Sequence, residues 1–97
     1  MEEFYNISEK EKENVLRSCF KSGDKLKLIA FPVKKKKQII VLKEIARKFN
    51  ASYKYNEKEI NEIIKDICDD YVSIRRHLIE YGFLERANDC SEYWLKE

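Results

Sequence analysis

The chain has 97 residues and a formal net charge of +2; 43% of the residues are hydrophobic and 39% are charged. This length supports one domain with one core, and the composition favours a soluble, mostly helical protein. The longest apolar run, Ile39 to Leu42, is much shorter than the roughly 18 residues that span a bilayer. No basic segment followed by an apolar block opens the sequence. We therefore expect a cytoplasmic protein with no secretory signal and no membrane partner.

The small net charge conceals an uneven distribution along the chain. Residues 1–20 carry three basic and five acidic side chains, residues 21–54 carry eleven and two, and residues 55–97 carry six and eleven. The net charges of these three regions are −2, +9 and −5. A surface that binds nucleic acid must be positive where it meets phosphate. The middle of the chain meets this requirement, and the C-terminal part does not.

Metal binding, cofactor binding and catalysis are disfavoured by the sequence. Cys19, Cys68 and Cys90 show no Cys-x-x-Cys spacing and accompany a single histidine, so three reduced thiols are expected. His77 follows Ser73 by about one helical turn. However, no glycine-rich turn offers an oxyanion site or a phosphate cradle. The sequence predicts a protein that is not an enzyme and uses no cofactor and no metal.

Residues 1–22 are expected to form an N-terminal helical extension. Ser8 and the glutamate three residues later have the spacing of a capping box, and an apolar stripe at helical spacing then predicts a helix over 8–20. Gly23 suits the left-handed cap that ends a helix. Residues 25–30 alternate lysine with leucine, which predicts a short strand.

Residues 23–97 are expected to form the core of the same single domain. The predicted elements are helices over 35–49, 57–68 and 70–81 and strands over 53–55, 83–87 and 92–96, with a turn at 88–91. The order of helix, short strand, helix, tight break, helix and hairpin is that of a winged helix. We predict an α+β winged helix with an extra N-terminal helix.

Motifs between residues 23 and 95 resemble a known family. They are Phe31-Pro32 before the lysine run, Val41-Leu42, Phe49, Tyr55-x-Glu57-x-Glu59-Ile60-Asn61, Asp70, Ile74-Arg75-Arg76-x-Leu78-Ile79, Gly82, Leu84-x-Arg86 and Tyr93. Together they are similar to the family called domain of unknown function 2087. The resemblance implies a winged-helix-like fold and a bacterial regulatory setting, in which members occur alone or behind an ArsR-type DNA-binding domain. It implies no catalytic residues.

The predicted helix 70–81 is the first candidate site. The second helix of a helix-turn-helix enters the major groove of DNA, and Ser73, Arg76, His77 and Glu80 are expected to point away from the apolar stripe. Arg76 can bind a guanine edge or a phosphate, and Arg86 on the hairpin can meet the backbone. Alternatively, Arg75 and Arg76 pair with acids of the preceding helix, such as Glu59, Glu62 or Asp66.

The run Lys34, Lys35, Lys36 and Lys37 is the second candidate site. With the basic residues around it, this run can follow a nucleic-acid backbone. The alternative is a solvated helix start. Positive charge is disfavoured at a helix N-terminus, so the placement invites a functional explanation.

Two functions stay open from the sequence. In the first, the chain is a DNA-binding domain of a transcription regulator, and its partner is double-stranded DNA. In the second, it is a protein-interaction or dimerisation module of a regulatory system, and its partner is a second copy or a regulatory protein. The +9 and −5 regions can pair between subunits in that case.

Overall fold

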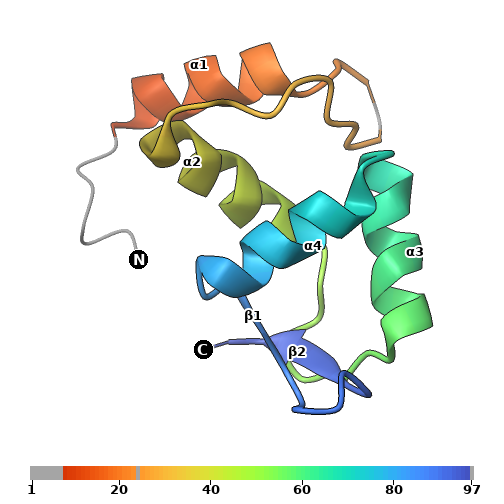
Figure 1. The fold of residues 1–97 in the computed structure, drawn as a ribbon. Helices are drawn as coiled ribbons and strands as arrows, with labels where there is room; N and C mark the ends of the chain where they lie inside the picture. Colours follow the sequence, from red (N-terminus) through yellow and green to blue (C-terminus); the bar gives the residue numbers. More distant parts are fainter. Residues whose placement is uncertain (1–7, 24, 97) are drawn as a thin grey trace.

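The computed structural model describes residues 8–23 and 25–96, so the first seven residues of the predicted N-terminal extension lie outside the described residues. The elements are α1 (Glu9–Cys19), α2 (Lys35–Ala46), α3 (Glu57–Ile67), α4 (Tyr71–Glu80), β1 (Leu84–Arg86) and β2 (Tyr93–Leu95). The α1 helix lies across the end of the domain that is opposite the hairpin (Figure 1). The α+β class is confirmed within the described residues, and the layout is compatible with a winged helix.

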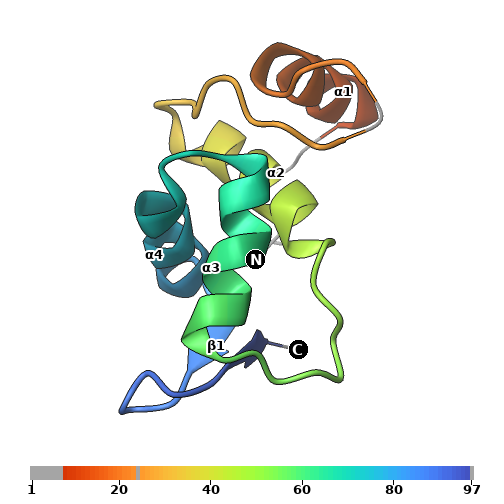
Figure 2. The same ribbon diagram turned by 90° about the vertical axis from the view of Figure 1, so that its right-hand side faces the viewer.

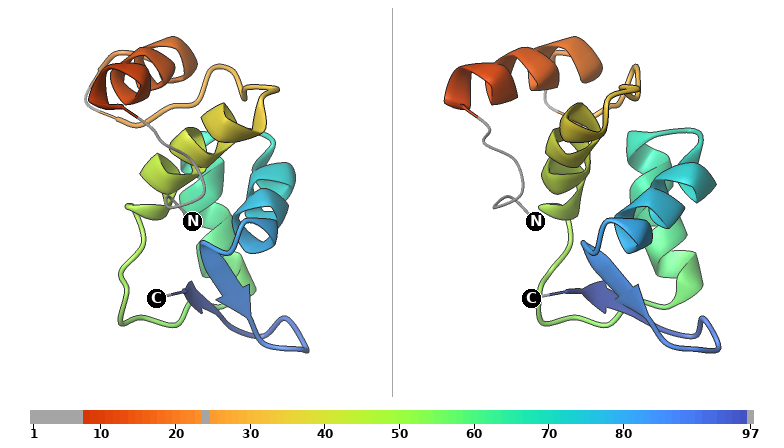
Figure 3. Two further views of the ribbon diagram at one scale, coloured as in Figure 1. Left: turned by 90° about the vertical axis from the view of Figure 1, so that its left-hand side faces the viewer. Right: turned by 60° about the vertical axis from the view of Figure 1, so that its left-hand side comes forward.

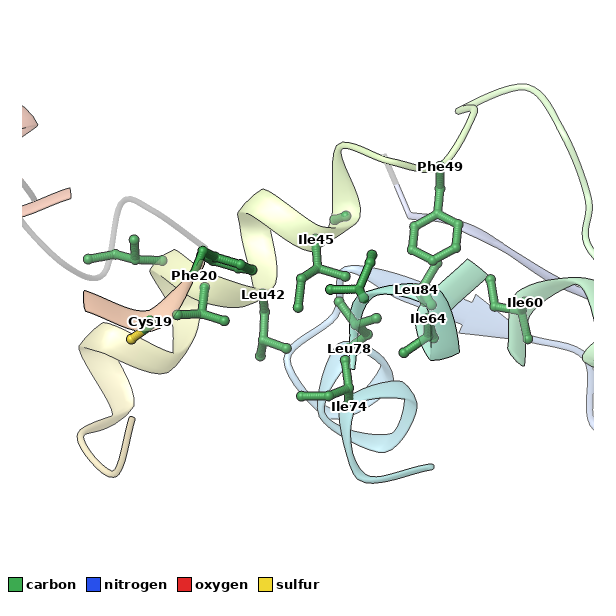
Figure 4. Close-up of a cluster of buried hydrophobic side chains, with 14 of the residues drawn as sticks. Cys19, Phe20, Leu42, Ile45, Phe49, Ile60, Ile64, Ile74, Leu78 and Leu84 are labelled. Carbon is green, nitrogen blue, oxygen red and sulfur yellow. The ribbon is translucent and has the colours of Figure 1, made fainter. Parts of the chain in front are cut away.

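The core forms where α2, α3, α4 and the hairpin meet. Leu42 of α2, Ile64 of α3 and Leu78 of α4 are fully buried, and these side chains lie close together with Leu84 of β1 (Figure 4). Burial of each such side chain contributes about 1.5–3 kcal/mol of transfer free energy before chain entropy is subtracted. The isoleucine and leucine stripes of the sequence therefore hold α4 at a fixed position.

The N-terminal helix begins and packs as its sequence predicts, but the strand predicted after it does not form. Ser8 accepts a hydrogen bond from the Glu11 amide at 3.1 Å, which is one half of the expected capping box. The Glu11 carboxylate pairs with Lys36 at 2.9 Å and not with the Ser8 amide. Over residues 25–30 only an isolated bridge joins Leu28 to Phe20. The Leu28 amide donates to the Ile67 carbonyl at 2.9 Å, and the Ile29 amide donates to the Cys19 carbonyl at 2.7 Å. This segment therefore joins the ends of α3 and α1 instead of pairing with a strand.

The predicted tight break separates α3 from α4. Asn56 and Glu59 form the predicted capping box at the start of α3. Residues 68–70 separate the two helices. Gly82, with φ of +82°, follows the end of α4, and only a residue that tolerates the left-handed region fits there. The two helices form a pair that crosses at a short turn.

The C-terminal hairpin is antiparallel, and its register pairs Leu84 with Leu95 and Arg86 with Tyr93. Tyr55 exchanges two backbone hydrogen bonds with Tyr93, at 2.8 and 2.7 Å. The strand predicted over 53–55 is therefore reduced to one bridge.

The helix predicted over 35–49 ends at Ala46 and continues as a turn. Among the residues described, no helix has the length and apolar character needed to cross a membrane.

Candidate nucleic-acid interface

The α4 helix lies at the outside of the bundle, next to α2 and α3 (Figure 3). One side of α4 packs in the core through the buried side chains Ile74 and Leu78. Three other sides remain: one meets α3, one meets segment 28–31, and one is open. The predicted site residues are divided among these sides, so each has to be placed separately.

Arg75 faces α3 and the hairpin. Its Nη1 donates a hydrogen bond to Asn61 Oδ1 and lies 3.6 Å from Glu57 Oε1. Its guanidinium also sits 6.0 Å from the centre of the Tyr93 ring. Only 17% of the side chain is exposed. The interpretation that Arg75 ties the two helices together is confirmed, although its acid is Glu57 and not one of the three acids expected.

Arg76 occupies the open side of α4. It is exposed, and within the described part of the chain no residue forms a hydrogen bond or an ion pair with it. The alternative that Arg76 pairs with an acid of α3 is therefore wrong for this structure. Of two adjacent arginines, one is used by the fold and the other is available to a partner.

Ser73 and His77 lie on the side of α4 that faces segment 28–31. A groove of about 350 Å³ separates the segment from the helix, and both residues line it. The His77 ring stacks on Phe31, with centroids 4.9 Å apart. Its Nδ1 is buried, lies 3.6 Å from Glu80 Oε2, and has no hydrogen-bond partner among the residues described. Phe31 therefore covers one face of the His77 ring, and contact of Ser73 and His77 with a nucleic acid stays a prediction.

The lysine run begins α2 beside the C-terminal end of α4. Tyr81 donates a hydrogen bond to Gln38 Oε1, and Gln38 donates to the carbonyls of Pro32 at 2.9 Å and Val33 at 3.2 Å. These bonds join the end of α4 to the start of α2. Lys35 Nζ accordingly lies 5.9 Å from the centre of the Tyr81 ring.

The other members of the run have different surroundings. Lys36 pairs with Glu11 of α1 at 2.9 Å. Lys34 stands at the N-cap of α2 without a capping hydrogen bond, and neither it nor Lys37 forms an ion pair with a described residue. Lys37 is exposed beside Cys19, where burial raises the pKa of the thiol and the lysine partly opposes that rise. Three lysines of the run therefore have no carboxylate partner among the residues that the structure describes.

The N-terminal end of α4 has the opposite character. Asp66, Asp69 and Asp70 are exposed there. Lys27 is 3.7 Å from Asp66 Oδ1, and Lys65 lies over the Tyr71 ring at 5.9 Å. The acids outnumber the cations at this end, so it does not attract phosphate.

Arg86 is exposed on the hairpin, where its guanidinium contacts the Cys90 sulfur. Its predicted contact with a DNA backbone stays a prediction. Within the described residues, no cluster of three or more histidine, cysteine or acidic side chains is arranged to hold a metal ion.

A hollow on the far side of α3 was not singled out by the sequence. It measures about 570 Å³ and is lined by Tyr53, Glu59, Glu62 and Asp66, among others. The Tyr53 hydroxyl donates to Glu59 at 2.8 Å. A hydrogen bond from the Asn56 backbone and the one from Tyr53 lower the pKa of Glu59. The acids recur at helical spacing, which the sequence shows, whereas the loop that makes the hollow is visible only in the fold. Its negative charge excludes it as a phosphate site.

The geometry defines a small α+β domain in which two helices cross at a three-residue turn and a hairpin follows. A family model described as "Uncharacterized protein conserved in bacteria (DUF2087)" matches residues 27–95. The chain belongs to this family, and the family resemblance drawn from its motifs is confirmed. No curated protein and no solved structure matches the chain.

Proposed function

We propose that the chain is a DNA-binding domain of a bacterial transcription regulator and that it has the winged-helix class of architecture and an ArsR-type regulatory setting. One observation carries the proposal. Arg76 stands exposed in the middle of α4 and has no partner in the described part of the chain, while Arg75 beside it is engaged by Asn61 and Glu57.

The chemistry of Arg76 fits this role. A guanidinium on the exposed side of a helix can donate two parallel hydrogen bonds to O6 and N7 of guanine in the major groove. Lys34 and Lys35 are exposed at the start of α2, where Lys35 lies beside Tyr81, and Arg86 is exposed on the hairpin. All three can neutralise phosphates. In DNA-binding domains of this kind, one helix commonly contacts the bases, and residues around it contact the phosphate backbone.

Electrophoretic shifts with a short duplex over a salt series test the proposal. Arg76→Ala is expected to lower the affinity by at least about tenfold, the effect of removing one base or phosphate contact. Arg47→Ala is the matched control, because Arg47 is 68% exposed and, among the described residues, pairs with Glu44 of the helix that it caps. The control is expected to stay within about twofold of the wild type. Absence of a shift with any duplex at low salt contradicts the proposal.

A second candidate is a protein-interaction or dimerisation module, with a second copy or a regulatory protein as the partner. It is favoured by Ile29, Val33 and Val72, which are 62%, 93% and 41% exposed. Exposed apolar side chains are compatible with an interface, although scattered ones are common on monomers. Light scattering at high concentration tests for self-association. A wild-type dimer that Val33→Ser converts to a monomer would support this candidate, and a monomer at every concentration would count against self-association.

A further inference from the structure

The segment between α1 and α2 restricts how a DNA duplex can approach α4. This segment passes over the α3–α4 turn (Figure 2). It is fixed there by the hydrogen bond from the Leu28 amide to the Ile67 carbonyl at 2.9 Å and by the stacking of Phe31 on His77. Helix-turn-helix proteins read bases with residues near the N-terminal end of the second helix. In this chain Ser73, on that half of α4, lines the groove between α4 and segment 28–31.

Charge restricts the approach in the same direction. Near the N-terminal end of α4, three exposed aspartates accompany two lysines, of which Lys27 is already engaged by Asp66. On the C-terminal half of α4 and at the start of α2, Arg76, Lys34, Lys35 and Lys37 are exposed. Of the acids in this region, Glu80 lies 3.6 Å from His77 Nδ1 and Glu11 is engaged by Lys36 at 2.9 Å. A phosphate chain is repelled at the first end and attracted at the second.

We infer that duplex DNA lies along the C-terminal half of α4 and across the start of α2, the reverse of the usual helix-turn-helix placement. This inference rests on the proposed function and adds the direction of docking. The contacts among Tyr81, Gln38 and the Pro32 carbonyl hold the start of α2 beside the end of α4 and so place Lys35 where it can bind the DNA backbone.

This placement also determines the class of DNA that is bound. The open side of α4 presents Val72, Arg76 and Glu80, and Arg76 is the one cation among them. One bidentate arginine discriminates between bases by about 10- to 100-fold, whereas specific regulators typically exceed their non-specific binding by about 10³- to 10⁷-fold. The chain therefore binds duplex DNA broadly, with a weak preference for guanine at one position.

Fluorescence anisotropy with a labelled duplex of about two helical turns tests the direction of docking. The variant Lys34→Gln/Lys35→Gln removes two positive charges from the start of α2. The variant Arg47→Gln/Lys48→Gln removes two positive charges just beyond the other end of the same helix, where both residues are exposed. We expect the first to lose at least tenfold in affinity and to reduce the slope of log K against log salt by about 1.8, or 0.9 per phosphate contact. The second is expected to stay within about twofold of the wild type. Circular dichroism checks that both remain folded.

The same assay separates the possible failures. Equal losses in the two double variants, or a larger loss in Ser73→Ala than in Lys34→Gln/Lys35→Gln, would overturn the direction of docking while leaving DNA binding in place. A preference above about 10³-fold for one duplex over a random pool would overturn the weak specificity. Tighter binding to single-stranded RNA than to the duplex would overturn the assignment of the ligand. No binding by the wild-type chain at low salt would overturn the proposed function itself.

Discussion

The polar residues around α3 and those at the start of α2 differ in what they contact. Asn56 and Glu59 close a capping box, and Glu57 and Asn61 hold Arg75. At the start of α2, by contrast, no acid occupies the first turn and Lys34 makes no capping bond. Stability accounts for the first group. It also accounts for Lys36, which pairs with Glu11, and for Gln38, which bonds to Tyr81. It does not account for Lys34, because positive charge at a helix N-terminus is unfavourable. The difference indicates which polar residues are available to a partner.

The largest effect expected from this comparison is on stability. Ile64 of α3 is fully buried, so Ile64→Ala is expected to lower the free energy of unfolding by about 2–5 kcal/mol. Lys34→Ala, at the start of α2, is expected to change it by at most about 0.5 kcal/mol. Urea denaturation followed by circular dichroism measures both. A loss in Lys34→Ala comparable to that in Ile64→Ala would contradict the comparison.

Arg75→Ala is expected to destabilise the domain by about 1–2 kcal/mol, because it removes a charged hydrogen bond that ties α4 to α3 and is partly exposed to solvent. Arg75→Lys sharpens the test. Lysine keeps the charge but cannot reproduce the planar fork, so we expect an intermediate loss. Thermal unfolding of the two variants beside the wild type gives the order. If Arg75→Ala were as stable as the wild type, the contacts of Arg75 with α3 would not contribute to the stability of the domain.

Asn56→Ala is expected to lower the free energy of unfolding by about 1 kcal/mol, the usual effect of losing an N-cap. Asn88→Ala in the exposed hairpin turn is a matched control, and we expect a change within about 0.5 kcal/mol. Urea denaturation again gives both values. If the two variants proved equally stable, the capping box would have no measurable role.

The smallest expected effect depends on pH. The pKa of Glu59 is lowered from its ordinary value of 4.5 by the backbone of Asn56 and the Tyr53 hydroxyl. Its folded pKa therefore lies below its unfolded pKa, so its contribution is present above about pH 4.5 and is lost as the pH falls through the folded value. Glu59→Gln should flatten the acid side of the stability profile, measured by urea denaturation from pH 7 to 3. Identical profiles for the variant and the wild type would contradict this.

The fold was largely predictable because its signals are local. Ser8, Asn56 and Gly82 mark helix ends within a few residues. Where the hydrophobic pattern fits more than one secondary structure, contacts with distant residues can determine which one forms. Residues 25–30 alternate as a strand does, yet their amides bond to the ends of α1 and α3. At the end of α2 the deciding contact is local instead: Phe49 continues the apolar stripe, but its amide bonds to the Ala46 carbonyl in a turn.

The candidate site was only partly predictable for the same reason. Helical spacing placed Arg76 on an open face, and it is open. The same spacing cannot show that Phe31, 46 residues earlier, covers His77. Likewise, the crossing of α3 and α4 brings Glu57 to Arg75, and this crossing is set by the core.

The different roles of Arg75 and Arg76 can be compared by measuring the thermal midpoint and the affinity for duplex DNA of Arg75→Ala and Arg76→Ala on the same samples. For Arg75→Ala we expect a lower midpoint with little change in affinity. For Arg76→Ala we expect an unchanged midpoint with at least about tenfold weaker binding. A stable Arg76→Ala variant that binds DNA as tightly as the wild type would show that Arg76 does not contact DNA.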